Sequence, residues 1–160
     1  LAEVRAIGHA IAGESLLARD SDDKAWDWSA QIQRGISEDG FLCLAVDTGR
    51  LEGLASLSLD RSRMDPAHEL VYVEYVASAP WNRQELGHPE VRGVGRLLVR
   101  TAITISLSLG YRGRLGLHSK PAVETFYRDR LGLIDFGLEM AEDGEWVYFE
   151  ATPEVARRLL

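Results

Sequence analysis

The stretch LVYVEYVASAP at residues 70–80 is followed, after a polar link, by VRGVGRLLVRTAITISLSLG at residues 91–110. The first stretch is rich in β-branched and aromatic residues and ends at a proline, which predicts a buried strand. In the second, apolar residues recur three and four positions apart, from Val94 and Leu97 to Leu109, which predicts an amphipathic helix that ends at the final glycine. A buried strand joined to a long helix through a glycine-containing link indicates a sheet packed with helices.

Shorter elements are expected on both sides of this pair. The other predicted strands are residues 41–46, 51–59, 115–118, 133–136 and 146–150. The other predicted helices are two before residue 40, one at residues 122–130 and one at residues 153–160. Leucines alternate with serines at residues 54–59, which predicts a half-buried strand, and Ser119 is expected to cap the helix that follows it, with Pro121 in the first turn. The fold class is therefore α/β or α+β with a mixed sheet.

The composition is that of an ordinary globular domain. The chain has 160 residues, of which 46% are hydrophobic and 27% charged, and this length suits one domain with its own core. No apolar run reaches the roughly 18 residues of a membrane span and the start is not typical of a secretory signal, so we expect a cytoplasmic protein. Cys43 is the only cysteine, which excludes a cysteine-based zinc site, and no His, Asp and Glu have metal-ligand spacing on one helix face, so no metal is expected.

The charge is unevenly distributed. The formal net charge is -7, which argues against a protein that binds nucleic acid in bulk. Residues 81–130 nevertheless contain nine Lys and Arg against four Asp and Glu, a net of +5, and the remainder carries a net of -12. We expect an anionic ligand at the basic segment and a cationic partner at the acidic remainder.

The link before the long helix contains RGVGR at residues 92–96. Glycines at the start of a helix let the main chain approach an anion closely, and flanking arginines add donors and charge. A P-loop is excluded because Arg96 and Leu97 stand where Lys and Ser or Thr are required, and a dinucleotide fingerprint is excluded because Leu98 stands where its third glycine is required. The glycine pair is also compatible with an ordinary helix start.

The order of these motifs resembles that of a known family. The strand at residues 70–80, the glycine loop, the long helix, a short strand and FYRDRLGL at residues 126–133 are together similar to the acetyl-CoA-binding half of the GCN5-related N-acetyltransferases (GNAT). The similarity extends over residues 70–137 and places Glu90 where the family has Arg or Gln. It implies a mixed, mostly antiparallel central sheet flanked by helices, in one domain of residues 1–160 whose first part, residues 1–69, forms the variable acceptor side.

The resemblance also implies a set of site residues. The cofactor-binding residues are expected to be Val76, Ala77, Ser78, Arg92, Gly93, Val94, Gly95, Arg96, Ser119 and Phe126. Tyr127 matches the tyrosine that the family uses as a general acid for the departing thiolate. Glu74 is the candidate general base, since a charge in the middle of an apolar strand is unusual and the attacking amine has to lose a proton.

The resemblance predicts that the protein is an N-acyltransferase. It would transfer an acetyl or other acyl group from acyl-CoA to a primary amine by direct attack, without a covalent enzyme intermediate. The acceptor is expected to be a small molecule or peptide with a cationic amine, and the family resemblance allows a homodimer. Two alternatives remain open: a non-catalytic acyl-CoA-binding regulatory module, which Glu90 favours, and a structural domain in which the glycines only start a helix.

Overall fold

The computed structural model describes residue 40 to residue 47, residues 49–82, residues 90–141 and residues 144–160. The two helices expected before residue 40 and most of the link between the predicted strand and the long helix lie outside these residues. The strands are β1 (Phe41–Asp47), β2 (Arg50–Arg61), β3 (Glu69–Ser78), β4 (Leu115–Ser119), β5 (Ile134–Ala141) and β6 (Gly144–Ala151). The α-helices are α3 (Val94–Ser108) and α4 (Pro153–Leu159), and short turns of helix cover Pro80–Asn82, Pro121–Val123 and Phe126–Arg130.

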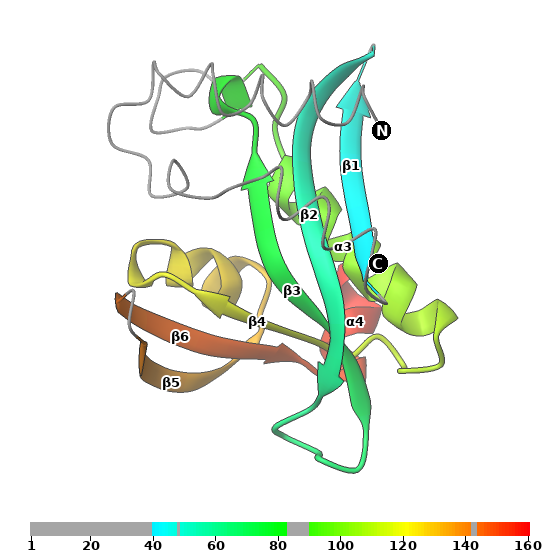
Figure 1. The fold of residues 1–160 in the computed structure, drawn as a ribbon, viewed down its shortest axis with the longest axis vertical. Helices are drawn as coiled ribbons and strands as arrows, with labels where there is room; N and C mark the ends of the chain where they lie inside the picture. The colour runs from blue at the N-terminus through cyan, green and yellow to red at the C-terminus, as the bar shows by residue number, and fades with distance from the viewer. Residues whose placement is uncertain (1–39, 48, 83–89, 142–143) are drawn as a thin grey trace. The chain divides into compact units, whose positions relative to one another are not determined.

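The strands form one six-stranded sheet in the order β1-β2-β3-β4-β6-β5 (Figure 1). β3 and β4 pair in parallel, with Val71 to Val73 opposite Leu115 to Leu117, whereas β6 pairs antiparallel with both β4 and β5. The predicted mixed sheet with flanking helices is therefore confirmed.

The chain groups into two compact units. The first consists of Leu1–Ser56 and Tyr75–Leu98, and the second of Leu57–Glu74 and Val99–Leu160. The boundary crosses β2, β3 and α3, so each of these elements contributes to both units.

Strand β2 is more buried than its sequence predicts. Every residue from Leu51 to Leu57 is buried, so the prediction of a half-buried strand is wrong. One face of the strand meets α3 at Gly53, where an added Cβ would lie 2.5 Å from Val94 Cγ1. The opposite face carries Glu52, which is hydrogen-bonded to the turn Pro80–Asn82. Both faces are covered in this way, and serine at position 56 is accommodated as a small buried side chain.

Helix α3 has the predicted extent but a rotated buried face. It ends at Ser108 and is followed by Gly110, which has a positive φ of 84°. The N–H of the next residue, Tyr111, donates to the Ser106 carbonyl at 2.8 Å, so the expected glycine stop is present. Leu97 is 54% exposed and Leu109 is 38% exposed, so these two leucines do not belong to the buried stripe. The buried stripe consists of Val94, Leu98, Val99, Ala102, Ile103 and Ser106.

A serine can occupy the buried face of α3 because its hydroxyl is satisfied. Ser106 is fully buried, and its hydroxyl donates to the Arg114 carbonyl at 2.7 Å. Hydrophobic patterning places polar residues outside the core because burying an unpaired hydroxyl is costly. The hydroxyl of Ser106 has a hydrogen-bond partner, so it avoids that cost. The apolar spacing therefore predicted the helix correctly but misplaced part of its inner face.

The segment after β4 differs from a regular helix. Ser119 is the last residue of β4 and its hydroxyl donates to the Lys120 carbonyl at 2.9 Å, so it is not the cap; Lys120 holds that position, with Pro121 in the first turn as predicted. The expected helix then continues as a π-helical turn, Phe126–Arg130, in which the Leu131 N–H donates to the Phe126 carbonyl at 3.1 Å. Such turns occur frequently at functional sites.

Candidate functional site

The first unit contains the predicted glycine loop at the start of α3. Gly93 has a positive φ of 84°, and its carbonyl accepts the Leu97 N–H at 2.9 Å, so α3 begins at Val94. The first N–H groups of a helix have no acceptor inside the helix, and together with the helix dipole they form an anion-binding end. Arg92 and Arg96 are exposed beside them. The loop thus has the donors and the charge that a phosphate ligand requires.

The end of β3 lies beside this loop. The Cβ position at Gly53 is 2.5 Å from Val94 Cγ1 and 2.8 Å from the Ala77 carbonyl oxygen, so the glycine lets β2, β3 and the first turn of α3 approach closely. Val76, Ala77 and Ser78 are the final, partly buried residues of β3. The structure therefore brings together the predicted strand residues and the predicted loop residues within the first unit.

A buried carboxylate fixes the turn that follows β3. Glu52 is 3% exposed, and its carboxylate accepts hydrogen bonds from Arg50 Nε at 2.8 Å, Trp81 Nε1 at 2.8 Å and Asn82 Nδ2 at 2.5 Å. Burial opposes its ionisation, but these hydrogen bonds outweigh the burial, so the pKa of Glu52 lies below its ordinary value. Sequence reasoning missed Glu52. The same signal was available as for Glu74, because both are acidic residues within an apolar strand.

Glu90, which departs from the family pattern, has a cationic partner. Its carboxylate lies 2.6 Å from Arg50 Nη2, and its main-chain N–H donates to the Trp81 carbonyl at 3.2 Å. Arg50 therefore bridges Glu90 and Glu52, and its guanidinium lies 4.8 Å from the centre of the Trp81 ring. The negative charge of Glu90 is balanced by Arg50 within this unit.

The second unit contains Tyr127 on the π-helical turn. Its side chain is 7% exposed, and its ring centre lies 5.1 Å from that of Phe126 and 5.8 Å from that of Phe149. Burial raises the pKa of Tyr127 to about 12. No residue in the described ranges forms a hydrogen bond with its hydroxyl. Tyr127 is therefore a buried, protonated phenol whose polar group has no protein partner in this part of the chain.

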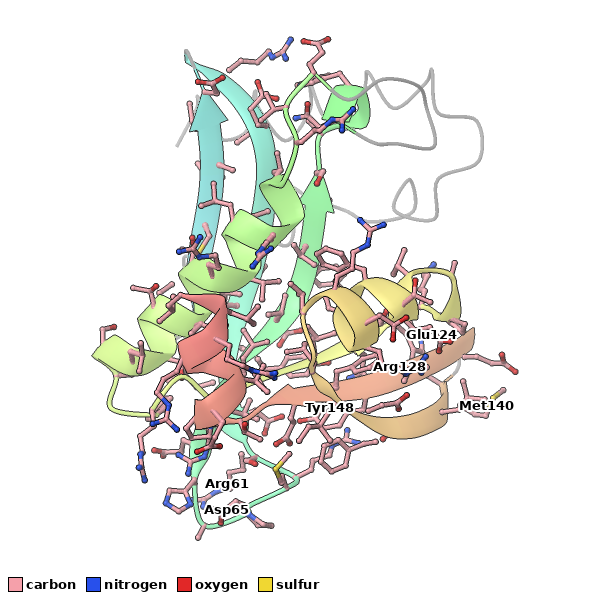
Figure 2. All side chains as sticks on the ribbon, turned by 180° about the vertical axis from the view of Figure 1, so that it is seen from behind. Arg61, Asp65, Glu124, Arg128, Met140 and Tyr148 are labelled. Carbon is pink, nitrogen blue, oxygen red and sulfur yellow. The ribbon has the colours of Figure 1, made fainter. Side chains whose placement is uncertain are left out.

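Ion pairs hold the turn that carries Tyr127. Arg128 Nε donates to Asp135 Oδ2 on β5 at 2.9 Å, and Arg128 Nη1 donates to Glu124 at 3.2 Å. Figure 2 shows Glu124 and Arg128 together on this segment. Hydrogen bonds from Arg128 and from the Gly137 N–H lower the pKa of Asp135, which keeps the partner of Arg128 ionised. The two partners restrict the orientation of the turn.

Glu74 and Tyr127 lie on opposite faces of the sheet. Val73 pairs with Leu117, and Leu117 pairs with Phe149, so these three side chains share one face, which Tyr127 covers. Glu74, the next residue on β3, points to the other face, where it is exposed and accepts the Ser58 hydroxyl at 2.6 Å. The β3–β4 pairing recorded for the described residues ends at Val73, immediately before Glu74.

The other two predicted site residues also belong to the second unit. Ser119 is 2% exposed, with its hydroxyl bonded to the Lys120 carbonyl. Phe126 is partly exposed beside Tyr127, with its ring nearly perpendicular to the tyrosine ring. The loop residues and β3 residues 76–78 therefore group in one unit, and Glu74, Ser119, Phe126 and Tyr127 in the other.

Tyr72, His118 and Glu139 form a hydrogen-bonded row on the same face of the sheet as Glu74. None of these three residues is a predicted site residue. His118 Nδ1 lies 2.6 Å from the Tyr72 hydroxyl, and His118 Nε2 lies 3.0 Å from Glu139 Oε2. His118 and its neighbour Ser119 point to opposite faces of β4, so they do not form a nucleophile and base pair. The partners of His118 come from β3 and β5, which are distant in sequence.

Neither a metal-binding cluster nor a membrane-spanning helix is found in the described ranges. Among these residues, no group of three or more His, Cys, Asp and Glu side chains is arranged to hold a metal ion. None of the helices described is both long enough and apolar enough to cross a membrane.

No family model matches this sequence, and neither does any curated protein sequence. Solved structures do match. One assigned to the GNAT family of acetyltransferases, from Desulfovibrio desulfuricans, has a TM-score of 0.66 at 13% identity, over 96% of this chain and 94% of its own. FeeM, an N-acyl amino acid synthase from uncultured soil microbes, has a TM-score of 0.66 at 15% identity, over 97% of this chain and 94% of its own.

A third match is an aminoglycoside acetyltransferase in complex with coenzyme A and kanamycin. It has a TM-score of 0.56 at 18% identity, over 94% of both chains. At such identities the likeness concerns the fold. The chain has the fold of the GNAT acetyltransferases, as the motifs at residues 70–137 predict.

Proposed function

We propose that the protein is an N-acyltransferase that transfers an acetyl or other acyl group from acyl-CoA to a primary amine by direct attack. The fold supports acyl transfer in general, because two proteins of similar fold are an N-acyl amino acid synthase and an aminoglycoside acetyltransferase.

The observation that carries the proposal is the environment of Tyr127. When an amine attacks a thioester, the departing thiolate needs a proton, and a thiol of this kind has a pKa of about 8.5. Burial raises the pKa of Tyr127 to about 12, so at neutral pH the phenol carries a proton that it can donate as a hydrogen bond to the departing sulfur. Its hydroxyl is buried and unpaired among the described residues, which suits a group whose partner is the substrate sulfur.

The glycine loop would hold the phosphates of acyl-CoA. The N–H groups at the start of α3 and the side chains of Arg92 and Arg96 supply donors, and Gly93 to Gly95 allow the main chain to approach the pyrophosphate. The main chain of Val76, Ala77 and Ser78 beside the loop would donate to the thioester carbonyl as its oxygen becomes negative. Ser119 and Phe126 would line the path of the pantetheine arm.

Glu74 would receive the amine on the other face of the sheet. An alkylamine with a pKa of about 10.4 costs about 4.6 kcal/mol to deprotonate at pH 7, so a base is required. Glu74 is an exposed carboxylate that can bind an ammonium group and accept its proton, directly or through water. A cationic acceptor fits this carboxylate and the net charge of -12 outside residues 81–130.

The binding half of the proposal predicts a thermal shift with coenzyme A. Ligand at about 100 times its dissociation constant should stabilise the fold by about 2.7 kcal/mol, which is a rise of roughly 5–10 °C in Tm for a domain of this size. The double variant Arg92→Ala/Arg96→Ala should lose most of this shift. Arg100→Ala, which removes a charge farther along α3, should keep the ligand-induced rise in Tm. Each variant is compared with its own ligand-free Tm. An unchanged Tm in the wild type would favour a structural domain.

The alternative of a non-catalytic acyl-CoA-binding module rests on Glu90, an acidic residue where the family has Arg or Gln. Arg50 balances the charge of Glu90. Coenzyme A would still raise the Tm of such a module, but no thiol would be released when an amine is added.

A cytoplasmic location and a homodimer stay predictions from the sequence.

A further inference from the structure

His118 lies at the centre of a hydrogen-bonded row that the proposed function leaves unused. Tyr72 on β3 contacts Nδ1 at 2.6 Å, and Glu139 on β5 contacts Nε2 at 3.0 Å. Register and pleat place Tyr72, His118 and Glu74 on one face of the sheet, because Val73 opposite Leu117 faces the other way. Along β3, Tyr72 and Glu74 are two residues apart, about 6.6 Å.

We propose that Tyr72, His118 and Glu139 form a proton relay in which His118, reached through the Tyr72 hydroxyl, is the final acceptor of the proton that the attacking amine loses beside Glu74. This inference rests on the proposed amine acylation and names the destination of its proton. Glu74 binds the ammonium group and, directly or through a bound water, passes its proton toward Tyr72. His118 acts through Tyr72 and is therefore a positioning and proton-accepting residue rather than one that touches the amine.

The protonation states of the neighbours fit this direction of transfer. Burial, with a smaller contribution from the charge of Glu74, raises the pKa of Tyr72 to about 12, so its hydroxyl is protonated and donates to His118 Nδ1. The hydrogen bond from His118 is the main cause that lowers the pKa of Glu139, assisted by Arg63 against the opposing effect of burial. An ionised Glu139 accepts the Nε2 proton and stabilises the imidazolium that forms when Nδ1 is protonated.

The charged or titratable side chains that contact the imidazole in the described ranges are Tyr72, Glu139, Arg63 and Tyr148. Arg63, from the connection between β2 and β3, pairs with Glu139 and lies 3.8 Å from the centre of the Tyr148 ring. The Tyr148 ring on β6 lies 4.8 Å from the centre of the His118 ring. Arg63 Nη2 is 3.4 Å from Nε2, so it opposes an extra charge on His118, and Glu139 offsets it.

The proton balance of the step is simple. The ammonium nitrogen releases one proton toward the Tyr72 oxygen while the Tyr72 hydroxyl gives its own proton to His118 Nδ1. The amine becomes a neutral nucleophile, Tyr72 remains a neutral phenol and His118 becomes an imidazolium. The imidazolium returns its proton to solvent before the next turnover, since the side chain of His118 is 21% exposed.

The test uses two acceptors that differ in whether their nitrogen carries the proton. Thiol release from acetyl-CoA is measured at pH 7 with the alkylamine that reacts fastest in a panel and with its O-alkylhydroxylamine isostere, whose nitrogen is already neutral. We expect His118→Gln to lower kcat about tenfold with the alkylamine and less than about twofold with the isostere. The loss with the alkylamine should shrink as the pH approaches 10, where the amine deprotonates unaided.

Two further variants keep the test decisive. Glu139→Gln retains a hydrogen-bond acceptor for His118 but removes the charge, and it should show the same dependence on the acceptor even if His118→Gln folds poorly. His68→Gln is the matched control, because His68 is an exposed histidine that pairs with Asp65 at 2.6 Å outside the row, and it should change neither rate. Equal losses with both acceptors, or no loss, would overturn the relay while leaving the proposed function intact. Failure of the wild type to release thiol with any amine would overturn both.

Discussion

Replacing Tyr127 by Phe is expected to lower kcat for amine-dependent thiol release about 100-fold at pH 7. The change removes one oxygen from a phenol that is 7% exposed and leaves its aromatic contacts with Phe126 and Phe149 in place. Without the hydroxyl, the thiolate has to leave unprotonated or take its proton from water. The measurement is steady-state thiol release from acetyl-CoA with a saturating amine.

The binding of coenzyme A separates this chemical effect from a structural one. The dissociation constant of coenzyme A should stay within about twofold in Tyr127→Phe, because the loop proposed to bind its phosphates belongs to a different part of the chain. Tyr111→Phe, a tyrosine outside the π-helical turn, should keep full activity. If Tyr127→Phe is as active as the wild type, Tyr127 is not the general acid.

Replacing Glu74 by Gln is expected to lower kcat/KM about 100-fold at pH 7 with an alkylamine acceptor. The amide keeps the shape of the side chain and can still accept the hydroxyl of Ser58, but it neither attracts an ammonium group nor takes its proton. The loss should shrink as the pH rises toward 10, because an amine with a pKa of about 10.4 then loses its proton without help.

A second carboxylate on the same strand provides the control for Glu74. Glu69 is the first residue of β3 and is exposed, so Glu69→Gln removes the same charge from the same strand and should leave the rate unchanged. A loss in Glu74→Gln that stays constant across the pH range would show that Glu74 positions the amine without acting as a base. A loss of equal size in Glu69→Gln would show a general effect of surface charge.

The elements with strong local patterns were predictable from the sequence. The apolar run of β3 and the regular spacing of α3 define both elements, and Gly110 ends α3 as expected because only its left-handed conformation closes the last turn. The turn near Gly49 likewise separates β1 from β2. These features depend on residues close in sequence, and single-chain patterns report such features well.

Features that depend on distant residues were not predictable. Glu52 is stabilised by Arg50, Trp81 and Asn82, and His118 by Tyr72 and Glu139, and neither set has a sequence spacing that marks it. The buried face of α3 was misplaced because the sequence does not show that Ser106 finds a partner in Arg114. Ser119 was assigned as a cap because a serine before a proline favours that role, whereas pairing with Val147 extends β4 through it.

The most direct test of acyl transfer compares the amount of thiol released with the amount of N-acetylated amine formed. Purified protein is incubated with acetyl-CoA and a panel of primary amines, free thiol is followed by a colorimetric reagent, and N-acetylated amine is quantified by mass spectrometry in the same samples. We expect at least one cationic amine to be N-acetylated in a one-to-one ratio with the thiol released, at a rate that falls about 100-fold in Tyr127→Phe. Thiol release without an acetylated amine, or no release with any amine, would contradict it.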